Sequence, residues 1–364
     1  MLTMLTKTSS TPSRSSVRSH VRAALLCLAL AAHAAPAGAQ SVPQPNPSTT
    51  WTVTLVLPPR VMAAHPATLA AFGVDGKLAA GVTVTLSDGQ TLTTDRTGRA
   101  LFTAPAAGDY LLAKGAGASA AALIDPAAGS SEPLETTLPP VISLRDRFWI
   151  CTAGLRGDAD SNSVRLNGEP ALVIAASPEC LVALPGSKAL PGPAAISVDA
   201  PGAHAAARAT LVALEFAAPQ PPLAPGKKSR LEVRVRGSDQ KLALVVDNVT
   251  PGVLKFMRGD SQQVLTRGGP QNAASLDVQA LRAGDFSFRA RLIPPADAAV
   301  AQRYLAAAAP LAPEDSRADL RAFARRIARH PRDLPMVRLQ LGEMLMQTIP
   351  GDFRALLTAA YDAL

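Results

Sequence analysis

Apolar and polar residues alternate with a period of two in several short segments of the chain. Leu231, Val233 and Val235 alternate with charged residues, and residues 82–86 alternate Val or Leu with Thr. This alternation is typical of a strand with one buried face, because successive side chains point to opposite sides of a sheet. The segments are separated by turn residues, which include many of the 32 prolines and 25 glycines. The pattern predicts a mainly β protein of short strands.

The alternating segments fall into three groups, which predict β domains at 51–127, 139–216 and 222–295. Hydrophobic residues make up 48% of the chain but aromatic residues only 4%, and small side chains favour several small cores over one large core. From residue 296 the period changes: Leu320, Phe323 and Ile327 recur at spacings of three and four. This spacing predicts amphipathic helices over 296–364.

Two of the β groups carry motifs of known domain families. In the first group, GVTVTL at 81–86 is followed by TDRTGRALF at 94–102, which resembles the bacterial Ig-like and carboxypeptidase-regulatory-like β sandwiches. In the second, NSVRLNG at 162–168 is followed by PGPAAISV at 191–198, an order similar to the IPT/TIG domains. AGLRG at 153–157 departs from the Gly-x-Gly-Phe that usually opens that family. The resemblances imply tandem Ig-like β sandwiches with a C-terminal α-helical region.

The first 39 residues have the features of a signal peptide. Four basic residues and no acid precede an apolar run at 23–32, and Ala37-Gly38-Ala39 forms a small-x-small cleavage site. A membrane anchor is the alternative, but the run has half of the about 20 apolar residues that a span needs. Leu26 before Cys27 is too bulky for a lipoprotein signal. Residues 40–50 predict a Pro- and Ser-rich linker, and no later segment predicts a span.

The net charge of the mature chain is modest. The whole sequence carries a formal charge of +8, and removal of four positive residues with the signal peptide leaves about +4. The remaining basic residues are scattered and not interleaved with aromatics, unlike the basic stripe of a nucleic-acid binder. We therefore expect no nucleic-acid partner.

The mature chain keeps two cysteines, Cys151 and Cys180. In an oxidising compartment an even pair predicts a disulfide, which would stabilise the middle domain by about 3.5 kcal/mol through the unfolded state. Two buried free thiols are the alternative interpretation.

The sequence contains none of the motifs of a familiar active site. Serine-hydrolase elbows, zinc-protease helices and phosphate-binding glycine loops are missing. Asp158, Asp160, Asn162 and Glu169 match four ligand positions of an EF-hand loop, but Ser163 stands where that loop needs glycine. We therefore predict no catalytic residues, no metal and no cofactor.

The expected function is that of an exported, non-catalytic protein of the periplasm, cell surface or extracellular space. Its β domains would act as spacers and binding modules for an envelope protein or a surface polymer, through the loop of Asp158, Asp160 and Asn162 or through the helical tail. Arg321, Arg325, Arg326, Arg329 and Arg332 in that tail form either a solvated face or a docking face for an acidic partner. The oligomeric state is not predicted.

Two other functions remain open. A carbohydrate-binding accessory protein would need exposed aromatic side chains, for which Trp51, Trp149 and Tyr110 are candidates. A hydrolase with an unfamiliar site would need a cleft of carboxylates, or a histidine such as His204 or His330 beside a nucleophile.

Overall fold

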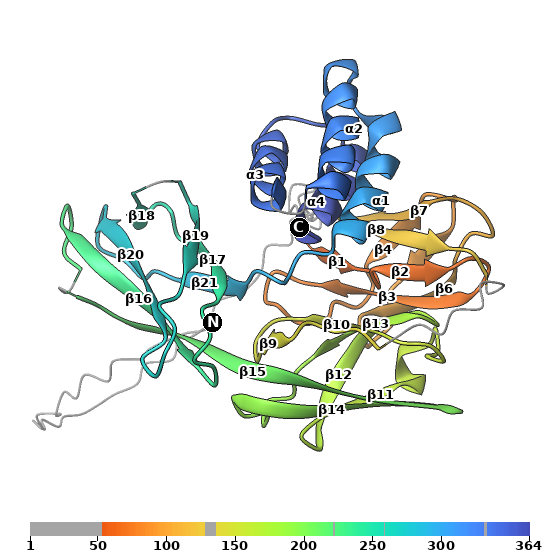
Figure 1. Cartoon of the computed structure of the whole chain (residues 1–364), viewed down its shortest axis with the longest axis horizontal. Coiled ribbons are helices and arrows are strands. Elements are labelled where there is room, and N and C mark those ends of the chain that lie inside the picture. The colour runs from red at the N-terminus through yellow and green to blue at the C-terminus, as the bar shows by residue number, and fades with distance from the viewer. Residues whose placement is uncertain (1–52, 128–135, 221–222, 258, 331–332) are drawn as a thin grey trace, which may run out of the picture. The chain divides into compact units, whose positions relative to one another are not determined.

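The computed structural model describes residues 53–127, 136–220, 223–257, 259–330 and 333–364 (Figure 1). The predicted signal peptide, the linker at 40–50 and Trp51 lie outside the described residues. Within those ranges the chain is mainly β, with three β sandwiches followed by four α-helices. The helices are too short or too polar to cross a bilayer in the part of the chain that is described.

Sandwich 1 is built from two sheets that enclose one apolar core. One sheet has the order β2-β8-β7-β4-β5, and the other pairs β3 with β1 and β6. Val84 and Leu86 of β4 are buried and its threonines are exposed, as the alternation at 82–86 predicts. The strands are β1 (Thr54–Val56), β2 (Arg60–Met62), β3 (Pro66–Phe72), β4 (Thr83–Leu86), β5 (Thr91–Thr93), β6 (Arg99–Thr103), β7 (Tyr110–Gly115) and β8 (Ala118–Asp125).

Sandwich 2 shares one long strand between its two sheets. β12 pairs with β11 at its start and with β13 at its end, and its register shifts between Val173 and Ala175. Asn167 and Gly168 both have positive φ and close the β11–β12 hairpin, as an Asn-Gly turn requires. The strands are β9 (Val141–Ser143), β10 (Phe148–Cys151), β11 (Ser163–Leu166), β12 (Glu169–Ala176), β13 (Cys180–Leu184), β14 (Gly192–Ala200) and β15 (Ala203–Gln220).

Sandwich 3 begins on the second half of β15. This strand pairs with β14 up to Leu211 and with β16 from Ala213 onward, so one strand belongs to both sandwiches. The predicted alternation of Leu231, Val233 and Val235 in β16 is confirmed, because all three are buried. The remaining strands are β16 (Lys228–Arg236), β17 (Ala243–Asn248), β18 (Leu254–Phe256), β19 (Ser261–Leu265), β20 (Ala273–Ala280) and β21 (Phe288–Leu292). The second sheet has the order β19-β17-β21.

The C-terminal helices pack on sandwich 1. Their core contains the buried side chains of Leu305, Phe353 and Leu356 together with Leu112 and Leu123 of β7 and β8. The helical region therefore buries its apolar face against a domain almost 200 residues earlier in the sequence. The helices are α1 (Ala298–Ala308), α2 (Glu314–Arg329), α3 (Leu334–Leu345) and α4 (Gly351–Asp362).

Candidate functional site

The polar loop that the sequence marks as a binding site folds onto itself. Asp158 caps the short 3-10 helix Ala159–Ser161, and its carboxylate accepts hydrogen bonds from Asp160 N at 3.1 Å and Ser161 Oγ at 3.0 Å. The buried Asn162 side chain accepts from Arg156 N at 2.9 Å and donates to the Arg156 and Asp158 carbonyls at 2.8 Å. These bonds give the loop one shape without a ligand.

The same loop also contacts sandwich 1. Thr68 Oγ1 donates to the Gly157 carbonyl at 2.7 Å and accepts from Ala159 N at 3.2 Å. Asp160 forms an ion pair with Arg99 of β6 at 2.7 Å. In the described part of the chain, no three acidic, histidine or cysteine side chains are placed to hold a metal ion. The loop of Asp158, Asp160 and Asn162 is thus part of an interdomain contact.

We name the contact between sandwiches 1 and 2 the first joint. Ala176 of β12 pairs with Thr68 of β3, which links sheets of the two domains. Next to this bridge, Ser177 Oγ donates to the Arg60 carbonyl at 2.7 Å. The joint also has its own apolar cluster, which contains five buried side chains from both sandwiches: Val56, Ala70, Ile174, Ala175 and Val182. Burial of this cluster favours a fixed arrangement of the two domains.

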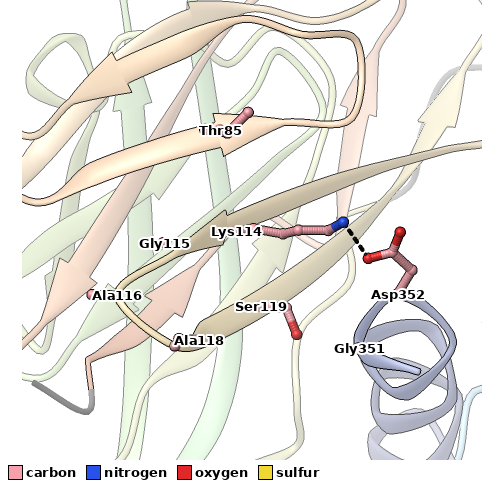
Figure 2. A pocket seen from close by; sticks show the side chains of 9 residues that line it. Thr85, Lys114, Gly115, Ala116, Ala118, Ser119, Gly351 and Asp352 are labelled. Carbon is pink, nitrogen blue, oxygen red and sulfur yellow. Dashed lines mark ion pairs between the residues drawn. The ribbon is translucent and has the colours of Figure 1, made fainter. Parts of the chain in front are cut away.

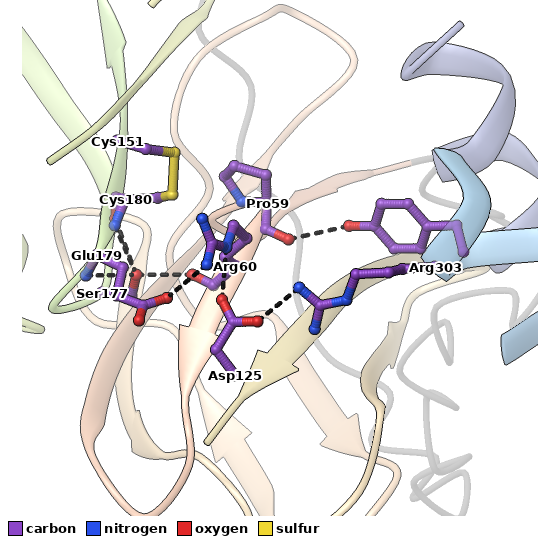
Figure 3. The surroundings of a disulfide bond; sticks show 9 residues. Pro59, Arg60, Asp125, Cys151, Ser177, Glu179, Cys180 and Arg303 are labelled. Atoms are coloured by element: carbon purple, nitrogen blue, oxygen red, sulfur yellow. Dashed lines mark hydrogen bonds and ion pairs between the residues drawn. A yellow bond between two sulfur atoms is a disulfide. The ribbon is translucent and has the colours of Figure 1, made fainter. Parts of the chain in front are cut away.

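A network of four charged side chains connects the first joint with the helices (Figure 3). Asp125, at the end of β8, accepts from Arg60 at 2.5 Å and from Arg303 of α1 at 2.6 Å. Glu179 Oε2 lies 3.7 Å from the Arg60 guanidinium, which is too long for a hydrogen bond, and it is buried without a hydrogen-bond partner. Sandwich 1, sandwich 2 and α1 therefore each contribute charge to one network.

The two carboxyl groups of this network have opposite pKa shifts. Burial raises the pKa of Glu179 to about 7, and the adjacent Asp125 carboxylate adds to the effect. Burial also acts to raise the pKa of Asp125, but the neighbouring Glu179 carboxyl group and the Arg60 and Arg303 guanidiniums bring it below its usual value. Such a split is also found in acid–base pairs of enzymes. Here the Asp125 side chain is only 8% exposed and the Glu179 side chain 16%, so a substrate has little access to either carboxyl group.

The predicted disulfide is confirmed. Cys151 and Cys180 stand opposite each other on β10 and β13, and their sulfur atoms are bonded at 2.03 Å. Cys180 follows Glu179 directly, and its backbone N–H donates to Ser177 Oγ at 3.0 Å. The disulfide therefore fixes the strand that carries the sandwich 2 side of the charge network (Figure 3).

A groove of about 540 Å³ lies between the β7–β8 hairpin and the start of α4. It is lined by Thr85, Lys114, the turn at 115–119, Gly351 and Asp352. Figure 2 shows Lys114 directed at Asp352, and these two form an ion pair at 2.5 Å. The charges of Lys114 and Asp352 in the groove thus neutralise each other.

The candidate histidines and aromatic residues do not come together. His204 bonds to Asp199 at 2.6 Å on the exposed β14–β15 hairpin, and His330 lies exposed after α2. Trp149 is half-buried, and Tyr110 is half-buried against the helical core. Trp51 lies outside the described residues.

The helical region exposes two side-chain stripes. Arg321, Arg325 and Arg329 follow one another at spacings of four along α2, are exposed, and form no ion pair with a described residue. Along α3, Met336 is 50% exposed and Leu339 59%, and Met346 just after the helix is 89% exposed. Arg326 differs from its neighbours because it pairs with Asp333 at 2.6 Å, and Arg332 lies outside the described residues.

Comparison with known proteins shows no family for this chain. No protein-family model matches the sequence, and no curated protein matches it either. Among solved structures, the chain is similar to the extracellular region of plexin A4, with 12% identity, a TM-score of 0.25, and coverage of 65% of this chain but 23% of that one. The N-terminal four Ig domains of Dscam1 give 10% identity, a TM-score of 0.22, and coverage of 64% and 73%.

The I9–I11 tandem of titin gives 10% identity and a TM-score of 0.19, with coverage of 66% of this chain and 95% of that one. The mainly β fold follows from the strands and sheets of the chain itself. The finer resemblance of the second sandwich to IPT/TIG domains stays a prediction.

The sequence did not indicate the charge network. Arg60, Asp125, Glu179 and Arg303 are far apart in the chain and belong to no motif. The only local signal was the position of Glu179 next to a cysteine expected to be in a disulfide.

Proposed function

We propose that this protein is an exported, non-catalytic spacer and binding protein of the cell envelope, and that its helical region binds an acidic segment of a partner protein. The proposal joins the expected signal peptide at 1–39 with the surface of α2 and α3. The single observation that carries it is the exposed apolar stripe of α3, because clustered exposed apolar side chains mark interaction surfaces.

The apolar stripe lies on the side of α3 that faces away from the helical core. Val337 and Leu341 point into the core and are fully buried. At 100° per residue, Met336, Leu339 and Met346 lie on the opposite side, where Glu343 is the neighbouring charge. A helix with apolar side chains on both sides is typical of a helix that has a second contact surface.

The exposed arginines of α2 are the reason for proposing a negatively charged partner. Three exposed arginines, which form no ion pair among the described residues, give this helix a positive stripe. Arginine is favoured at interfaces because its guanidinium binds carboxylates in a bidentate way. An acidic segment with some apolar side chains would complement both helices.

A spacer role is supported by the first joint. Sandwich 1, sandwich 2 and α1 are connected by buried apolar side chains, hydrogen bonds and ion pairs. Such contacts hold neighbouring domains in one arrangement. The loop at 158–162 contributes to this joint, so the helical surface is the better candidate for partner binding.

Affinity capture from envelope extract tests the proposal. The bait is the chain from residue 40, which keeps the whole described fold. We expect it to hold a protein that Arg325→Glu/Arg329→Glu and Leu339→Ser/Met346→Ser both lose, and that Val74→Ser on sandwich 1 keeps, since Val74 is 77% exposed. Cross-linking should place an acidic segment of that protein on α2 or α3. Capture that is unchanged in both helix variants would contradict the proposal.

A further inference from the structure

The strand register of sandwich 3 places several loop segments at one end. β18 begins at Leu254 opposite Ala280, where β20 ends, and β19 begins at Ser261 opposite Asp247 near the end of β17. The loops that follow β17 and β20 therefore meet there, and the described residues 259–260 lead into β19 at the same end. Leu281 N donates to the Val253 carbonyl at 2.8 Å. β15 runs toward this end, because its last paired residue, Gln220, lies opposite Arg230 near the start of β16. The strand therefore enters sandwich 3 from sandwich 2 at the other end.

These loops expose apolar side chains. Val249 is 57% exposed, Met257 50%, Leu281 44% and Phe286 40%. Phe286 is the one aromatic residue among the large hydrophobic side chains that are exposed in the described residues. Its ring lies 5.7 Å from that of Phe288, which anchors it on the core of the sandwich. Val249 N donates to the Ser287 carbonyl at 3.1 Å, so the loops that follow β17 and β20 support each other.

Cations surround the apolar side chains. Lys228 and Lys255 both stand opposite Gln279 and so flank it on the outer face of the sheet. Lys227 lies in the adjoining turn, where Gly226 N donates to the Ala280 carbonyl at 2.8 Å, and Arg282 follows Leu281. All four are exposed, and none forms an ion pair with a described residue. The exposed acids nearby in the described residues are Asp260, Asp277 and Asp285, of which Asp277 lies 3.8 Å from Arg230.

We propose that this end of sandwich 3 docks on an anionic lipid surface. The apolar side chains would enter the boundary between headgroups and acyl chains, and the lysines and Arg282 would contact phosphate groups. This surface is separate from the helical stripes and does not depend on the proposed partner.

Lipid is favoured over other partners by the combination of side chains. An anionic polysaccharide would bind the cations but would not bury the four exposed apolar side chains on these loops. A membrane interface uses both, because binding grows with the apolar area that is buried and with attraction to anionic headgroups. A membrane interface also requires no surface of complementary shape, so side chains from separate loops can insert into it together.

Vesicle sedimentation tests this proposal. The chain from residue 40 is mixed with vesicles of phosphatidylcholine alone or with phosphatidylglycerol, at low and high salt. We expect binding to the anionic vesicles that weakens with salt, because exposed charges are screened. Lys227→Glu/Lys255→Glu should weaken binding at least 25-fold, at roughly fivefold for each positive charge removed. Met257→Ser/Phe286→Ser should weaken it about tenfold.

The control is Val74→Ser/Lys77→Glu, which changes an exposed apolar and an exposed basic residue of sandwich 1 and should bind like the unchanged chain. Circular dichroism and urea unfolding confirm that each variant is folded. Absence of binding to anionic vesicles, or equal binding by the loop variants, would overturn the proposal. So would loss of a captured protein in the loop variants without any vesicle binding, since that result assigns the surface to a protein.

Discussion

The two connections between neighbouring sandwiches are built differently. At the first joint, sandwiches 1 and 2 are held by an apolar cluster, by hydrogen bonds to Thr68 and Ser177, and by ion pairs. Between sandwiches 2 and 3, which we name the second joint, the main link is the backbone of β15, which belongs to both domains. No ion pair crosses the second joint within the described ranges.

The two joints hold neighbouring domains in place by different kinds of contact. Side-chain contacts depend on composition, protonation and packing, so the first joint can be weakened by single substitutions. A shared strand depends on backbone hydrogen bonds, which substitutions leave in place. Close backbone packing adds to the second joint, because a Cβ on Gly237 would lie 2.4 Å from the Leu211 carbonyl. We therefore expect the joints to respond differently to the same kinds of change.

Removal of the disulfide should have the largest effect. Cys151→Ser/Cys180→Ser opens a loop with a sequence separation of 29, and we expect the free energy of unfolding to fall by about 3.5 kcal/mol. Urea unfolding measures the loss, and the unchanged chain under reducing conditions is the matched sample. Hydrogen exchange should rise in β10, β13 and the first joint. An equal rise throughout sandwich 3 would show that the shared strand transmits the damage.

A larger side chain at Gly157 should disrupt the first joint. A Cβ there would lie 1.9 Å from the Pro66 carbonyl, so Gly157→Val forces the loop away from sandwich 1. We expect a cost of about 3 kcal/mol, measured by urea unfolding, and faster exchange of the Ala159 amide that bonds to Thr68. Gly351→Ala is the control, because no atom lies within 4 Å of its Cβ position. A cost no larger than that of the control would mean that the loop shifts freely.

The stability of the charge network should depend on pH. The pKa of Glu179 is raised from 4.5 to about 7, so between these values the folded state holds a proton that the unfolded state has lost. Stability therefore falls as pH rises through this window and levels off above it. The lowered pKa of Asp125 acts in the opposite direction, but only below its usual value of 3.8. We expect a decrease of about 2 kcal/mol between pH 4.5 and 7.5.

Glu179→Gln isolates this effect. The amide has the shape of the protonated acid and does not titrate, so the variant should lack this part of the pH dependence. Urea midpoints of both proteins across pH 4.5–7.5 give the comparison. Parallel curves would mean that Glu179 titrates normally in the folded protein.

Strands and helices could be predicted from the sequence, but their docking could not. The alternation in β4 and β16 and the spacing of Leu320 and Ile327 in α2 reflect one buried face, which is a local property of the chain. The presence of both remaining cysteines in one predicted domain was sufficient to predict the disulfide. The six domain ranges themselves stay a prediction.

The first joint depends on residues that look like surface residues in sequence. Arg60 and Arg303 have no periodic pattern around them. The pairing of β2 with β8 places Arg60 beside Asp125, and the packing of α1 on sandwich 1 places Arg303 there. Asp158 and Asp160 resembled a ligand loop because capping, ion pairing and metal binding all use the same carboxylates. Only the position of Arg99 and Thr68 shows how the loop is used in the structure.

The smallest predicted effect compares an ion pair at the first joint with an ion pair near the second joint. Arg99 is only 11% exposed where it meets Asp160 at the first joint, and it also donates to the Val173 carbonyl at 3.3 Å. Arg236 of β16, near the second joint, meets Glu215 at 3.1 Å and is 65% exposed. Because water screens exposed pairs, we expect Arg99→Met to cost about 1 kcal/mol and Arg236→Met about 0.3 kcal/mol or less. Urea unfolding of both variants at low and high salt measures the two costs. If Arg236→Met costs as much as Arg99→Met, the second joint also depends on its side chains, and the distinction between the joints is lost.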